Sequence, residues 1–187
     1  MATYLLDNSA SRFTVRAFAS GMLSVMGHNP TIAIRAFTGN IEFDPDAPQQ
    51  ATLKVEVRAD SLEVTDDISN KDRREIETTM NQKVLESARY PAITFESTAI
   101  SVDQLGDGRY KAILNGSLSL RGVSRSIPLT AQVSLSGDLL RAYGEFSILQ
   151  SAFAISPVSV AGGALKLKDE LKLNFDMVAR APSSDSV

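Results

Sequence analysis

Residues 170–180, which read ELKLNFDMVAR, decide the fold class of this 187-residue chain. The apolar side chains of this stretch fall at every second position, at Leu171, Leu173, Phe175 and Met177. Successive side chains of a β-strand point to opposite faces of the sheet, so the alternation predicts a strand with one buried face.

The same period of two recurs along most of the chain. It predicts further strands over residues 13–20, 32–43, 53–59, 92–102, 110–120, 127–136 and 140–150. Within 32–43 the apolar face changes parity, which predicts a bulge near Ala36–Thr38. Turn residues separate the runs at 44–46, 106–108, 136–138 and 162–163. About eight strands joined by short turns predict an all-β fold, an up-and-down antiparallel barrel that is closed or nearly closed.

One segment has a different period, and it predicts an amphipathic helix over about residues 70–86. It contains no Gly or Pro, and Ile76, Met80 and Val84 recur at a spacing of four. Asn70 is the expected N-cap, and Asp72 lies near the positive end of the helix dipole. We expect this helix to pack on the barrel across one of its open ends.

Composition limits the class of protein. A hydrophobic content of 43% and a charged content of 22% are typical of a globular domain, which we assign to residues 1–182, followed by a flexible polar tail at 183–187. The net charge of −3 argues against nucleic acid as a partner. The sequence shows no signal peptide and no apolar run that could span a membrane, so the expected location is cytoplasmic, or periplasmic if a leader has been trimmed.

Chemistry-bearing motifs are sparse. With no cysteine and His28 as the only histidine, thiolate chemistry and multi-histidine metal sites are excluded. We interpret His28 as a turn residue before Pro30 rather than as part of a Ser-His-Asp relay, because no nucleophile motif accompanies it. The acidic residues of 66–77 interleave with basic ones, which favours a solvated helix entry over a cation site. We therefore predict no enzyme activity, no catalytic residue, no metal and no cofactor.

The inward positions of the predicted strands mix large side chains with small ones, and small ones leave room in a barrel interior. A long apolar space suits an extended hydrocarbon. Lys166 and Lys168 could meet an anionic head group, although such lysines more often keep an outer strand face soluble. The predicted ligand-binding residues of the interior are Phe13, Val15, Ala17, Ile32, Ile34, Val55, Phe95, Leu114, Gly116, Leu129, Ala131, Phe146, Ile148, Leu173 and Phe175.

Four stretches carry a resemblance to a known family: residues 6–15, 37–44, 90–97 and 114–123. Residues 90–97, YPAITFES, are similar to a Pro-x-Ile-x-Phe-x-Ser signature, and residues 114–123 are similar to a Gly-x-Leu-x-Leu-x-Gly-Val signature. From Tyr4 to Arg180 the chain resembles the YceI-like family, the lipocalin-like polyisoprenoid-binding proteins. Residues 6–15 are similar to that family's first hairpin.

The resemblance implies an extended eight-stranded antiparallel barrel whose tunnel binds an isoprenoid or fatty-acyl chain, in a protein that can form a homodimer. Residues 24–30 and 150–155 depart from the family pattern where strands meet loops, which leaves the ligand's head-group end open. The leading hypothesis is non-enzymatic binding, storage or transport of a long apolar ligand in the barrel. The alternative is a structural or interaction domain whose barrel is filled by its own side chains and holds no lipid.

Overall fold

The structure is a computed structural model, and it describes residues 1–20, 29–160 and 165–182. The strands are β1 (Ala2–Leu6), β2 (Arg12–Arg16), β3 (Ala19–Ser20), β4 (Thr31–Ile34), β5 (Phe37–Phe43), β6 (Thr52–Arg58), β7 (Leu62–Val64), β8 (Ala92–Gly106), β9 (Arg109–Leu120), β10 (Val123–Ser136), β11 (Leu139–Leu149), β12 (Ser159–Val160), β13 (Leu165–Leu167) and β14 (Glu170–Arg180). The helical segments are η2 (Pro48–Gln50), η3 (Ala59–Ser61), α1 (Asn70–Thr79), η4 (Met80–Val84) and η5 (Gln150–Phe153).

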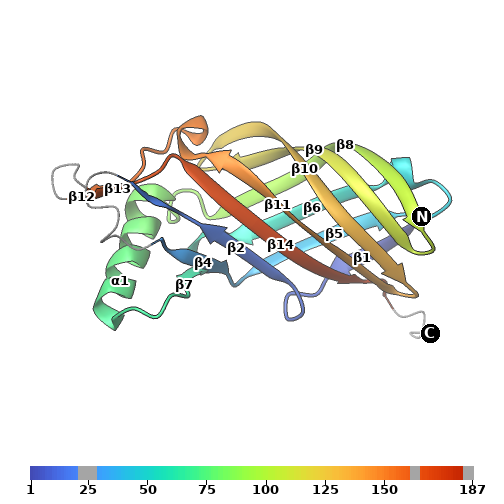
Figure 1. Ribbon diagram of the computed structural model, residues 1–187, viewed down its shortest axis with the longest axis horizontal. Helices are drawn as coiled ribbons and strands as arrows, with labels where there is room; N and C mark the ends of the chain where they lie inside the picture. The colour runs from blue at the N-terminus through green and yellow to red at the C-terminus, as the bar shows by residue number, and fades with distance from the viewer. Residues whose placement is uncertain (21–28, 161–164, 183–187) are drawn as a thin grey trace.

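Eight antiparallel strands close into a barrel in the order β1-β5-β6-β8-β9-β10-β11-β14, and β1 pairs back onto β14. The strands run obliquely along an elongated body, with α1 at one end and the N-terminus toward the other (Figure 1). Closure removes the free sheet edges that would otherwise invite aggregation. The predicted all-β, eight-stranded antiparallel barrel with one helix is confirmed.

The long strands β8 to β11 and β14 form most of the wall, and their inner faces carry the predicted apolar side chains. The registers place inward residues of neighbouring strands opposite one another, as in Phe175↔Phe13, Leu114↔Leu129 and Ala112↔Ala131. The predicted turns at 44–46, 106–108 and 136–138 are present, whereas 162–163 lies outside the described residues. His28 and the polar tail at 183–187 also lie outside them.

Three neighbouring stretches of the wall are interrupted at the same level of the barrel. The interruptions separate β1 from β2, β4 from β5, and β6 from β7. The predicted bulge near Ala36–Thr38 is therefore wrong: Arg35 and Ala36 lie between two strands, because the chain changes partners there, from β2 and β7 to β1 and β6. The expected first hairpin is also wrong, since β1 and β2 do not pair with each other but follow one another along β14.

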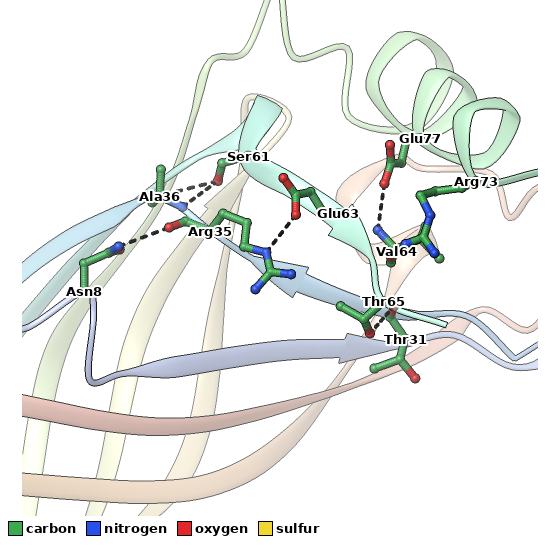
Figure 2. Close-up of polar contacts among 10 residues, drawn as sticks. All are labelled: Asn8, Thr31, Arg35, Ala36, Ser61, Glu63, Val64, Thr65, Arg73 and Glu77. Atoms are coloured by element: carbon green, nitrogen blue, oxygen red, sulfur yellow. Dashed lines mark hydrogen bonds and ion pairs between the residues drawn. The ribbon is translucent and has the colours of Figure 1, made fainter. Parts of the chain in front are cut away.

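At the interruptions, hydrogen bonds from polar side chains, together with one backbone bond, replace the missing hydrogen bonds between strands (Figure 2). The Asn8 side chain donates to the Arg35 carbonyl at 3.2 Å and accepts from the Phe37 amide at 3.2 Å. The Ala36 amide donates to the Ser61 hydroxyl at 3.1 Å, and the Arg58 amide donates to the Ala36 carbonyl at 3.0 Å. With these bonds the backbone can bend without leaving buried polar groups unpaired.

Helix α1 covers the outer edge of β7, the last strand beyond the bend (Figure 2). The carboxylate of Glu77 accepts from the Val64 amide at 2.9 Å, and the Arg73 guanidinium donates to the Val64 carbonyl. The helix thus supplies the hydrogen bonds that a further strand would make. Its N-cap is Ser69, whose hydroxyl accepts from the Asp72 amide at 3.1 Å, so the prediction of Asn70 is wrong by one residue.

Candidate functional site

The barrel interior contains two apolar chambers. The inner chamber lies away from the helix and measures about 150 Å³, and the helix-end chamber measures about 510 Å³. Five residues line both chambers and form the ring between them: Ile34, Val57, Ile93, Leu118 and Leu173. Two of them, Ile34 and Val57, lie beside the interruptions of the wall, so the larger chamber begins where the strands bend.

The structure brings the predicted interior residues together around these chambers, with the exception of Gly116. The inner chamber is lined by Phe13, Ile34, Val55, Phe95, Leu114, Leu129, Ala131, Phe146, Leu173 and Phe175. The helix-end chamber is lined by Val15, Ala17, Ile32, Ile34, Ile148 and Leu173. The period of two identified the inward face of each strand, and barrel closure placed those faces around one interior.

Gly116 does not leave room in the way that the sequence predicted. A Cβ atom built there would lie within 3.0 Å of three carbons of the Phe95 ring. Gly144 has the same role, because the Phe175 ring and the Thr130 carbonyl occupy the space beside it. The missing side chains are thus replaced by aromatic rings from neighbouring strands, and these rings narrow the inner chamber.

The end of the barrel opposite the helix is closed by aromatic side chains. Tyr4, Phe43 and Tyr110 are buried, and the rings of Phe43 and Tyr110 meet edge to face with their centroids 5.3 Å apart. Burial raises the pKa of Tyr4, and the nearby charge of Asp138 acts in the same direction. The Tyr4 phenol is therefore neutral at physiological pH, and this end of the interior stays apolar.

Helix α1 and the adjoining η4 contribute a wall to the larger chamber that strand periodicity could not predict. Ile76, Met80 and Val84, the predicted apolar stripe, all line it, together with Leu85. The sequence predicted this stripe as a packing face, whereas part of it faces empty space. Three charged residues line the same chamber, Asp72, Glu75 and Lys166, and all three are exposed, which places them at its rim.

One polar side chain, Gln150, lines the larger chamber at depth. It begins η5 and is 3% exposed. Its Nε2 atom donates to the Lys168 carbonyl at 2.9 Å, and its backbone amide donates to the Asp169 carbonyl at 2.9 Å. Residues 150–155 depart from the family pattern, but the sequence does not indicate a role for Gln150, because a polar residue at a strand end has no periodic signal.

The described part of the chain shows no arrangement typical of a metal centre. Across residues 1–20, 29–160 and 165–182, no three His, Cys, Asp or Glu side chains gather closely enough to hold an ion. Its ion pairs, such as Lys54–Glu96 at 2.8 Å and Arg35–Glu63 at 2.8 Å, lie on the outer surface. None of the helices in those same ranges has the length and apolarity to cross a membrane.

A closed antiparallel barrel of eight strands, with a hollow apolar interior and one helix at its end, defines a lipocalin-like class of protein. The family signature described as "YceI-like domain" matches residues 4–179. The chain therefore belongs to the YceI-like family, as the sequence resemblance predicted. No curated protein matches the chain in sequence.

Solved structures share the fold. BcnA from Burkholderia cenocepacia superposes with a TM-score of 0.73 at 20% identity, covering 92% of this chain and 98% of that one. A domain from Saccharophagus degradans, described as polyisoprenoid binding and implicated in plant cell wall breakdown, gives 0.69 at 16% identity and covers 97% and 100%. The Campylobacter jejuni YCEI protein gives 0.62 at 18% identity and covers 84% and 88%. At these identities the likeness establishes the fold.

Proposed function

We propose that this protein binds a long apolar ligand, an isoprenoid or fatty-acyl chain, inside the barrel and holds it for storage or transport without catalysis. The observation that carries the proposal is the helix-end chamber, whose volume of about 510 Å³ falls within the roughly 300–1,000 Å³ typical of ligand pockets. The membership of the YceI-like family and the structural likeness to a polyisoprenoid-binding domain support it.

The apolar walls favour a hydrocarbon over a polar metabolite. Each methylene group moved from water into such a site gains about 0.8 kcal/mol, so a chain of several carbons binds without any polar contact. The inner chamber of about 150 Å³ is the size of an engineered cavity that stays dry, and it lies beyond the ring as space for the far end of the chain.

The alternative, a structural or interaction domain with a self-filled barrel, predicts an interior without chambers of this size. Close packing elsewhere in the barrel makes the contrast clear: Phe95 fills the space at Gly116, and Phe175 fills the space at Gly144. Protein interiors avoid voids because unfilled space forfeits contacts. A void of about 510 Å³ at one end therefore favours a ligand over a self-filled core.

Native mass spectrometry of purified protein, before and after solvent extraction and reloading with prenyl alcohols or fatty acids, tests the proposal. Wild-type protein should carry a mass adduct of one chain. Ala17→Leu fills part of the larger chamber and Ala131→Leu part of the inner one, and both should weaken uptake with little loss of stability. Thr130→Leu, on the outer face of the same strand as Ala131, is the matched control.

In a filled core, Ala131→Leu would overpack the interior and cost about 1–3 kcal/mol of unfolding free energy. That cost, together with wild-type protein that repeatedly takes up no chain, would reject the binding proposal in favour of the structural alternative. If Ala17→Leu loses uptake and Ala131→Leu does not, the ligand occupies the larger chamber and does not reach the inner one.

A further inference from the structure

Among the described residues, two polar side chains are buried, Ser11 and Gln150, and they differ in their hydrogen bonds. The Ser11 hydroxyl donates to the Val178 carbonyl at 3.2 Å and accepts from the Val178 amide at 2.9 Å, so both of its functions are used. Gln150 uses its Nε2 atom on the Lys168 carbonyl at 2.9 Å, and no described residue donates to its Oε1 atom. Ser11 is a structural group, whereas Gln150 has a free acceptor.

The free acceptor of Gln150 faces the larger chamber. The bond from Nε2 to the Lys168 carbonyl fixes the orientation of the amide, because the reverse orientation would bring two oxygen atoms together. In the described part of the chain, no side-chain N or O atom is both sealed from solvent and unpaired. Since Gln150 lines the chamber, its Oε1 is reached from that space. A buried acceptor without a partner costs free energy, which a ligand that donates to it would recover.

The charges that line the larger chamber disfavour an anionic group beside Gln150. The charged residues that line the larger chamber are the exposed Asp72, Glu75 and Lys166, two carboxylates against one ammonium. An anion beside Gln150 would face an oxygen atom that repels it, and Lys166, the ammonium among the described lining residues, lies at the exposed rim.

We propose that the ligand's polar end is an uncharged hydrogen-bond donor, a hydroxyl or a primary amide, which donates to Oε1 of Gln150. The apolar chain then extends toward the ring and the inner chamber. This inference rests on the proposed function and names the ligand's chemistry within it. Gln150 acts as a specificity-determining residue that distinguishes a neutral head group from a phosphorylated one.

Three probes with the same chain test the inference: geranylgeraniol, its methyl ether and its diphosphate. The ether keeps the oxygen but cannot donate. One hydrogen bond of about 0.5–1.5 kcal/mol corresponds to roughly 2- to 10-fold in Kd, so wild-type protein should bind the alcohol tighter than the ether by that factor. The diphosphate should bind more weakly than the alcohol. In Gln150→Met, the alcohol and the ether should bind equally.

Calorimetric titration measures the three affinities, and Gln132→Met is the matched control. Gln132 lies on β10 next to the inward Ala131, so its side chain points outward, and the alcohol-to-ether ratio should stay at the wild-type value. Equal affinities for alcohol and ether in wild-type protein overturn the inference even if Gln150→Met does not fold. A diphosphate that binds tightest overturns it as well and assigns the head group to Lys166. Failure of all three probes to bind counts against the proposed function instead.

Discussion

The contact between Gly116 and Phe95 allows a quantitative test of how the barrel interior is filled. In Gly116→Ala the new Cβ would lie within 3.0 Å of three ring carbons, so the ring must move. Overpacking of this kind costs about 1–3 kcal/mol, while the reduced backbone entropy of alanine returns about 0.5–1 kcal/mol. The clash is the larger effect, and we expect a net loss of about 1–2 kcal/mol.

Urea unfolding and thermal melts measure this loss. For a chain of this size, each kcal/mol shifts Tm by about 2–4 °C, so Gly116→Ala should melt about 2–8 °C lower than wild type. Phe95→Leu removes the ring and the clash with it. The double variant should therefore be more stable than the sum of the single effects predicts, with a coupling of at least about 1 kcal/mol.

Gly137→Ala is the control for backbone effects. Nothing lies within 4 Å of a Cβ built at Gly137, and its φ of +60° makes any alanine there strained. Its penalty should not change when Phe95 is replaced by leucine. If Gly116→Ala is as stable as wild type, or if its effect is simply additive with Phe95→Leu, then the ring does not fill the glycine's space and the packing argument is refuted.

Three further predictions concern the helix and the outer surface. Glu77→Ala leaves the amide of β7 without its acceptor and should cost about 1–3 kcal/mol in urea unfolding. Ser69→Ala removes the N-cap and should cost about 1 kcal/mol, with reduced helix signal in circular dichroism before the main transition. The guanidinium of Arg141 lowers the pKa of Asp176, so this pair stabilises the fold above the ordinary aspartate pKa of 3.8. That contribution, about 0–1 kcal/mol for an exposed pair, is lost as the pH falls through the lowered value, and Asp176→Asn should match wild type there.

Each of these predictions has an outcome that contradicts it. The control is Glu75→Ala, at an exposed position of the same helix, which should change the unfolding free energy by less than about 0.5 kcal/mol. If Glu77→Ala loses no more stability than Glu75→Ala, the assigned role of the Glu77 hydrogen bond is contradicted. An unchanged helix signal in Ser69→Ala would show that the capping bond contributes nothing. For Asp176→Asn, a stability difference that stays constant on acidification below pH 3.8 would contradict the assigned ion pair.

The sequence by itself determined most of the strands and their inward faces, but it did not predict β1 (Ala2–Leu6), which closes the barrel. Alternation is a local property that every strand carries, so Leu171, Leu173 and Phe175 could be assigned to the interior before any pairing was known. The helix was equally readable, because a spacing of four is also local. The antiparallel barrel followed from short turns, since two strands joined by a tight turn usually pair side by side, although β1 and β2 do not.

Only the tertiary structure decided how the interior is filled and where it widens. From the sequence, the missing side chain of Gly116 predicted free space in the interior, but the ring of Phe95 on the neighbouring strand occupies that space. The parity change near Ala36 looks like a bulge, but it marks a bend that is shared by three stretches of wall. Gln150 becomes a candidate head-group contact only through its neighbours. These features depend on contacts between residues that are distant in the chain, and local periodicity carries no information about such contacts.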